Sequence, residues 1–77
     1  MTENDLSNLG FNKNESQDGD STYIYFDLDI GGVSLVSNDS DEWESEDLEV
    51  TLEESDVVFK NYEDLSLFVD LLRRNVE

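Results

Sequence analysis

Apolar and polar residues alternate strictly over residues 22–30, and this is the clearest structural signal in the chain. The residues of one parity are Ile24, Phe26, Leu28 and Ile30, and those of the other are Tyr23, Tyr25, Asp27 and Asp29. A period of two in a segment rich in aromatic and β-branched residues predicts a strand with one buried face.

Directly after this strand, Gly31-Gly32 predicts a tight turn. Two consecutive glycines accept the positive φ angles that a type I′ hairpin turn requires. Apolar residues resume at Val33 and Leu35. In a two-residue hairpin Ile30 faces Val33 and Leu28 faces Leu35, so the register and the apolar pattern agree.

Two further strands and a helix are predicted in the second half of the chain. Leu48, Val50 and Leu52 alternate with polar residues and indicate a third strand. The short apolar run over residues 57–59 fits either a fourth strand or the start of the helix. Asn61 is a suitable N-cap, and Arg73 and Arg74 suit the last turn of a helix. The apolar residues at helical spacing are Leu65, Phe68, Val69, Leu72 and Val76, with Leu67 and Leu71 widening that face.

The first 21 residues read as a polar N-terminal arm that contains a short helix over residues 2–9. Thr2 is its expected N-cap, and Gly10 stands where such a helix would end. Residues 12–20 are turn-like and are expected to form a linker. We therefore expect one α+β domain over residues 22–77. It would be a small antiparallel sheet of three or four strands with the C-terminal helix packed on one face.

The charge of the chain restricts its possible functions more than any motif does. The chain of 77 residues carries 21 Asp and Glu against 4 Lys and Arg, a formal net charge of −17, and it has no Cys and no His. It therefore lacks thiol and imidazole chemistry, disulfides and soft-metal ligands. A body of this charge is repelled by nucleic acids and anionic membranes, so we expect neither as a direct partner, but rather a basic protein.

Other functions are not expected. No apolar run reaches the ~18 residues of a membrane span, and the start of the chain is acidic, so we expect a cytoplasmic protein. The segment Asp18-Gly19-Asp20 resembles the centre of a calcium loop, but Tyr25 stands where the bidentate Glu should be. We expect no metal and no cofactor. The carboxylates appear in exposed positions without a cleft to shift their pKa values apart, so we do not expect an enzyme.

The acids are concentrated in the middle of the sequence. Fifteen lie between Asn14 and Phe59, where no Lys or Arg occurs, and ten of these lie from Asp39 to Asp56. Strand parity places several on the sheet face opposite the helix. The expected partner-binding residues are Tyr25, Asp27, Asp29, Asp39, Asp41, Glu42, Trp43, Glu44, Glu46, Glu49 and Glu53. Trp43 has two interpretations, a core residue beneath the acidic loop or an exposed aromatic anchor for an Arg-rich surface.

In size and charge the chain resembles small acidic phage-encoded anti-defence proteins, the DNA mimics that inhibit CRISPR effectors or restriction enzymes. The acidic stretch over residues 38–47 carries much of this resemblance. It implies an inhibitor that occupies the basic nucleic-acid groove of a host defence protein and blocks DNA binding. One alternative is an immunity protein or antitoxin that neutralises a basic nuclease. Another is a general acidic interaction module, for example a homodimer formed through a strand edge or through Leu67 and Leu71.

Overall fold

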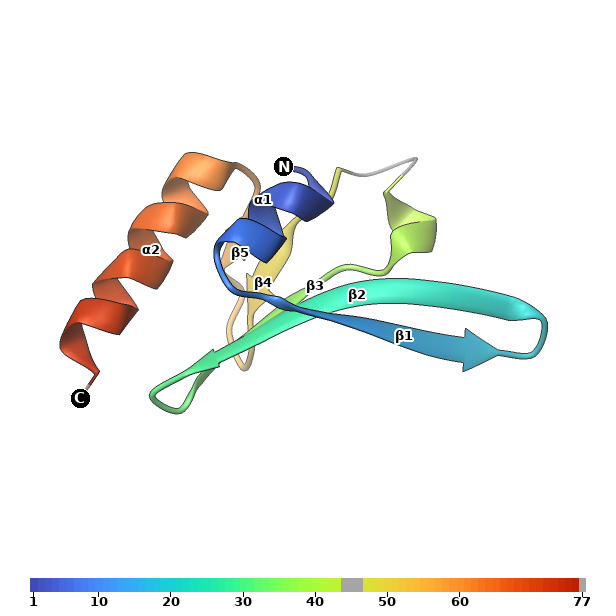
Figure 1. Cartoon of the computed structure of the whole chain (residues 1–77), viewed down its shortest axis with the longest axis horizontal. Helices are drawn as coiled ribbons and strands as arrows, with labels where there is room; N and C mark the ends of the chain where they lie inside the picture. Colours follow the sequence, from blue (N-terminus) through green and yellow to red (C-terminus); the bar gives the residue numbers. More distant parts are fainter. Residues whose placement is uncertain (44–46, 77) are drawn as a thin grey trace.

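The computed structural model describes residues 1–43 and 47–76 and has the predicted α+β architecture (Figure 1). The sheet is antiparallel and has five strands in the order β1-β2-β3-β4-β5. The elements in chain order are α1 (Glu3–Asn8), β1 (Asn12–Asp18), β2 (Ser21–Ile30), β3 (Val33–Ser37), the 3-10 helix η1 (Ser40–Glu42), β4 (Val50–Leu52), β5 (Val58–Phe59) and α2 (Tyr62–Asn75).

The β2–β3 hairpin has the register that the sequence predicts. Ile30 pairs with Val33, and Leu28 pairs with Leu35. Both turn glycines have positive φ angles, 56° at Gly31 and 84° at Gly32. These angles are unfavourable for residues with a Cβ, which explains why the turn uses two glycines.

Strand β1 was not predicted, and the expectation of a linker over residues 12–20 was wrong. β1 pairs with β2 along its whole length, from Asn12 opposite Asp27 to Asp18 opposite Ser21. Its residues are exposed except for the half-buried Asn14, so no apolar alternation marks it. Because β3 pairs only with Asp27–Ile30 of β2, the first half of β2 and its partner β1 project as a two-stranded ribbon (Figure 1). The longest dimension of the molecule is consequently 42 Å.

Both helices pack on the same face of the sheet and enclose a single core (Figure 1). The buried apolar side chains are Leu6, Leu9, Phe11, Phe26, Leu28, Leu35, Leu48, Val50, Leu65 and Val69. The N-terminal helix therefore supplies part of the core. It begins with a capping box, in which Asp5 N–H donates to Thr2 Oγ1 at 3.2 Å and Thr2 N–H donates to Asp5 Oδ2 at 3.0 Å.

Helix α2 starts at the predicted cap and is joined to α1 at its other end. Asn61 Oδ1 accepts a hydrogen bond from Asp64 N–H at 2.9 Å. Near the C-terminus, the Arg73 guanidinium donates to the carbonyl oxygen of Leu9, directly after α1. A cation at this position satisfies a carbonyl group that the end of α1 leaves unpaired.

The apolar face of α2 is narrower than the sequence suggests. Leu65 and Val69 are buried, whereas Leu67 is 68% exposed and Leu71 is 52% exposed. The expectation that the last two widen the packed face was wrong. Helix α2 covers only one end of a small sheet (Figure 1), so only a narrow face of the helix packs against the core. No helix in the described part of the chain is long and apolar enough to cross a membrane.

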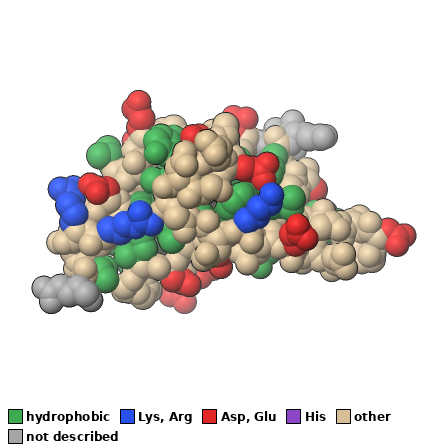
Figure 2. Space-filling model, in the orientation of Figure 1, with side chains coloured by type: hydrophobic (Ala, Val, Ile, Leu, Met, Phe, Trp, Pro, Cys, Tyr) green, Lys and Arg blue, Asp and Glu red, His purple; other side chains and the backbone are tan. Residues whose placement is uncertain are grey.

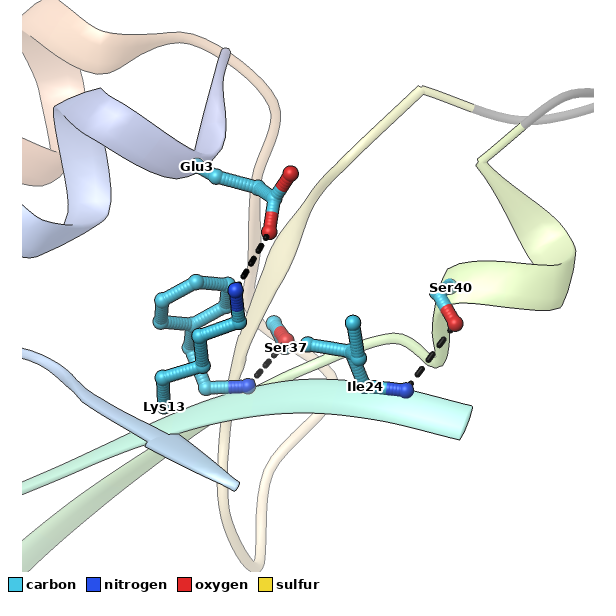
Figure 3. Close-up of polar contacts among 6 residues, drawn as sticks. Glu3, Lys13, Ile24, Ser37 and Ser40 are labelled. Atoms are coloured by element: carbon cyan, nitrogen blue, oxygen red, sulfur yellow. Dashed lines mark hydrogen bonds and ion pairs between the residues drawn. The ribbon is translucent and has the colours of Figure 1, made fainter. Parts of the chain in front are cut away.

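Serine hydroxyl groups continue the edge of β2 where β3 has ended (Figure 3). Phe26 N–H donates to Ser37 Oγ at 2.7 Å, and Ile24 N–H donates to Ser40 Oγ at 2.9 Å. On the other edge, Lys13 of β1 forms an ion pair with Glu3 of α1 at 3.7 Å (Figure 3). These contacts hold η1 and α1 against the base of the ribbon.

Candidate partner-binding surface

The side of the sheet opposite α1 and α2 is not covered by any described element, and we call it the open face. None of its strand positions is fully buried. Its residues, from the strands and the positions next to them, are Asn12, Asn14, Ser16, Asp18, Ser21, Tyr23, Tyr25, Asp27, Asp29, Ser34, Val36, Glu49, Thr51, Glu53, Val58 and Lys60. Five of the eleven predicted partner-binding residues lie here: Tyr25, Asp27, Asp29, Glu49 and Glu53.

Neighbouring strands fix the two aspartates of the open face. Asn14 Nδ2 of β1 donates to Asp27 Oδ1 at 2.9 Å. Ser34 Oγ of β3 donates to Asp29 Oδ1. Each hydrogen bond uses one oxygen of its carboxylate and reduces the freedom of the side chain. Neither Asn14 nor Ser34 was among the predicted site residues. Ser34 stands opposite Asp29 in the predicted hairpin, but Asn14 becomes a neighbour of Asp27 only when β1 is recognised as a strand.

The carboxylates of the open face are spread out and do not form a single cluster. Asp27 and Asp29 are two residues apart on β2, which corresponds to ~6.8 Å. Across the sheet, Asp29 is opposite Ser34, and Glu53 N–H donates to the carbonyl oxygen of Ser34 at 3.0 Å. Two strand spacings of ~4.8 Å therefore separate Asp29 from Glu53. The open face therefore carries negative charges at spaced positions along and across the strands.

A second group of predicted residues lies on the other side of the sheet. Asp39 precedes η1, and Asp41 and Glu42 are part of it. η1 lies on the same side of the sheet as the two helices (Figure 1). The open face and these loop acids are therefore two separate surfaces, which a partner cannot contact with one flat patch.

Trp43 adopts the core position, one of its two interpretations from the sequence. Its ring is half-buried and stacks on Phe26, with the ring centroids 6.4 Å apart and the planes at 26°. Its indole N–H donates to both the carbonyl oxygen and Oδ1 of Asn38, at 3.0 Å each. Asn38 Oδ1 also accepts from Glu49 N–H at 3.1 Å. Trp43 and Asn38 thus join the acidic loop to β4. Glu44 and Glu46, which were also predicted to bind the partner, lie outside the described residues.

Three of the four basic residues lie away from the open face, and the exception is Lys60, which follows β5 with the same parity as Val58. Lys13 is the one basic residue within the described strands, and it is opposite Phe26 on the helix side of the sheet. Arg74 pairs with Asp70 at 3.1 Å, and Arg73 bonds to Leu9 as described above. Figure 2 shows Asp and Glu side chains (red) around the outline of the molecule and Lys and Arg side chains (blue) over its left half and centre.

The described residues contain no group of three or more Asp or Glu placed to hold a metal ion. Asp18-Gly19-Asp20 forms the turn between β1 and β2, at the tip of the ribbon. Gly19 has a φ of 63°, a left-handed conformation that a hairpin turn uses.

The chain matches no protein-family model, no curated protein and no solved structure at a significant level.

Proposed function

We propose that this protein binds the basic nucleic-acid groove of a host defence protein, a CRISPR effector or a restriction enzyme, and blocks its access to DNA. The observation that carries the proposal is the segregation of charge. The open face holds Asp27, Asp29, Glu49 and Glu53, and Lys60, next to β5, is the one basic residue with the parity of this face. Such a face attracts a basic surface and repels DNA itself.

The charge density of the molecule supports replacement of a duplex. A net charge of −17 over a longest dimension of 42 Å gives one charge per about 2.5 Å. Duplex DNA carries one charge per ~1.7 Å of its axis. The protein thus offers roughly two thirds of the linear charge of the ligand that it would displace. Because the β1–β2 ribbon makes the molecule elongated, the protein suits an extended groove better than a compact pocket.

Hydrogen bonds restrict the open-face carboxylates, and this restriction supports tight binding in addition to electrostatic attraction. Asp27 and Asp29 are held by Asn14 and Ser34, so less side-chain entropy is lost when they meet a partner. Tyr25 lies on the same face, two residues before Asp27 on β2, where its ring can contact arginine side chains. Association would be steered by charge and would weaken steeply with added salt.

The experiment that tests this proposal is a capture from lysate of the host, with the protein as bait. Bound proteins are eluted with a salt gradient, and the capture is repeated in the presence of duplex DNA. We expect a DNA-binding defence protein that elutes late and is displaced by the duplex. A captured nuclease whose binding ignores duplex DNA would favour the immunity-protein alternative, and retention of nothing specific would contradict the proposal.

A further inference from the structure

A groove of about 460 Å³ lies at the end of the sheet, where the β2–β3 turn and the β4–β5 turn meet α2. Its size falls within the ~300–1,000 Å³ of typical binding pockets. The residues that line it are Gly32, Val33, Ser34, Leu52, Glu53, Glu54, Ser55 and Phe68. The sequence pattern gave no signal for it, because it is assembled from two turns and a helix that are distant in the chain.

The groove combines an apolar wall with an acidic edge. Val33, Leu52 and Phe68 are half-buried, whereas Glu53 and Glu54 are exposed. The Phe68 ring is supported from within by Phe59, at a centroid distance of 5.0 Å. No Lys or Arg lines the groove, and neither glutamate takes part in an ion pair among the described residues.

The turn that carries the two glutamates has a fixed shape. Leu52 N–H donates to the Val57 carbonyl at 3.0 Å and closes the turn. Ser55 Oγ donates to the Leu52 carbonyl at 3.1 Å and accepts from Val57 N–H at 3.1 Å. Glu54 is the one described non-glycine residue with a positive φ, 65°. The turn therefore presents two consecutive carboxylates at the groove in a defined orientation of the backbone.

We propose that this groove binds an arginine side chain of the partner protein. The aliphatic part of arginine matches Val33 and Leu52, and its planar, weakly hydrated guanidinium suits an aromatic ring with carboxylates beside it. The ammonium group of lysine is more strongly hydrated and lacks the planar fork, so it fits this combination less well. The inference rests on the proposed function for the identity of the partner, since a groove that binds DNA phosphates is rich in arginine.

The chemistry of the groove can be tested without any partner. The probe is N-acetyl-arginine methylamide, titrated into ¹⁵N-labelled protein and followed through the backbone amide signals. We expect saturable shifts confined to the groove, at Val33, Ser55 and Phe68. The citrulline analogue, which is a neutral isostere, should bind about tenfold more weakly, as expected when a charged hydrogen bond is lost.

Matched variants separate the groove from the general charge of the protein. The double variant Glu53→Gln/Glu54→Gln should weaken arginine binding about tenfold, because the charged acceptors are lost at constant shape. The control Glu15→Gln/Asp18→Asn removes the same charge from the exposed ribbon and should leave binding unchanged. The same spectra report whether each variant is folded.

Two results would overturn the inference. One is the absence of saturable shifts at tens of millimolar probe. The other is an equal loss of affinity in both double variants, which would mean that only the overall charge attracts arginine. Either result leaves the proposed function testable, because competition between the protein and duplex DNA is measured separately. Conversely, binding of arginine in a protein that does not compete with DNA would contradict the proposed function alone.

Discussion

The two faces of the sheet are built from the same strands but differ in burial and in charge. On β2, Phe26 and Leu28 face the helices and are buried, whereas Tyr25 and Asp27 face outward and are only half-buried. The covered face holds the fold together by burial of apolar surface. The open face carries charge that opposes folding through self-repulsion, which is consistent with selection for binding. Substitutions on the covered face should therefore mainly lower stability, whereas substitutions on the open face should mainly weaken binding of the proposed partner.

The largest contrast is expected between neighbouring aromatic residues. Phe26 is 1% exposed, so Phe26→Ala should lower the free energy of unfolding by about 3–5 kcal/mol. That is most of the stability of a domain of this size. Tyr25→Ala on the open face should cost less than about 1.5 kcal/mol. Urea denaturation followed by circular dichroism measures both, and similar losses in the two variants would mean that the open face is packed.

A second contrast tests whether the N-terminal helix belongs to the folded body. Leu6 is fully buried, and Leu6→Ala should cost about 2–5 kcal/mol in free energy of unfolding. Leu67, which is 68% exposed on α2, is the matched control, and Leu67→Ala should change stability by at most about 0.5 kcal/mol. If Leu6→Ala were as mild as its control, residues 1–11 would be a loose arm after all.

Salt should act on stability and on binding in opposite directions. Screening of the net charge of −17 should stabilise the fold by about 1 kcal/mol, or roughly 4–8 °C in Tm, when NaCl is raised from low to physiological concentration. The same salt should weaken capture of a basic partner. Thermal unfolding across a salt series measures the first effect. A Tm that falls with salt would show that self-repulsion is not the dominant electrostatic contribution.

The smallest effect is expected at Glu54, in the turn between β4 and β5. Its left-handed backbone is unfavourable for a residue with a Cβ, so Glu54→Gly should raise the free energy of unfolding by about 0.5 kcal/mol after the greater unfolded-state entropy of glycine is included. The neighbouring Glu53→Gly has no such strain to relieve and should destabilise. Urea denaturation measures the free energy of unfolding of both variants. If Glu54→Gly were no more stable than Glu53→Gly, the backbone at Glu54 would not be strained.

The sequence predicts the covered face better than the surfaces that carry the proposed function. Alternation over residues 22–35 determines the hairpin register, and Asn61 marks the start of α2, because both signals are local. β1 escapes prediction because an edge strand exposed on both faces needs no apolar residues. Residues 57–59 fit either a strand or the start of the helix, and it is the pairing with β4 that makes β5 a strand. This pairing is not visible in the local sequence.

The distribution of the acids also depends on distant parts of the chain. Parity places Asp27, Asp29, Glu49 and Glu53 on the open face. It cannot show that Trp43 packs on Phe26 and thereby keeps Asp41 and Glu42 on the other side. The groove beside Phe68 requires three segments to meet, so no pattern within one segment predicts it.

The most direct test of DNA replacement by the open face is a competition for DNA that compares two charge-reversed variants. The captured defence protein is bound to a fluorescent duplex, and displacement of the duplex is followed by fluorescence anisotropy. One variant is Asp27→Lys/Asp29→Lys/Glu49→Lys on the open face. The other is Glu15→Lys/Asp20→Lys/Glu63→Lys, at positions of the ribbon and of α2 outside the open face, and both have a net charge of −11, since each reversal adds two to −17.

We predict that the open-face variant keeps its circular dichroism spectrum and loses at least about 100-fold in competition, or ~2.7 kcal/mol. The control variant should lose far less. Equal losses would mean that the total charge matters and not the face. Retained competition by a folded open-face variant would contradict the claim that the open face of the sheet takes the place of DNA.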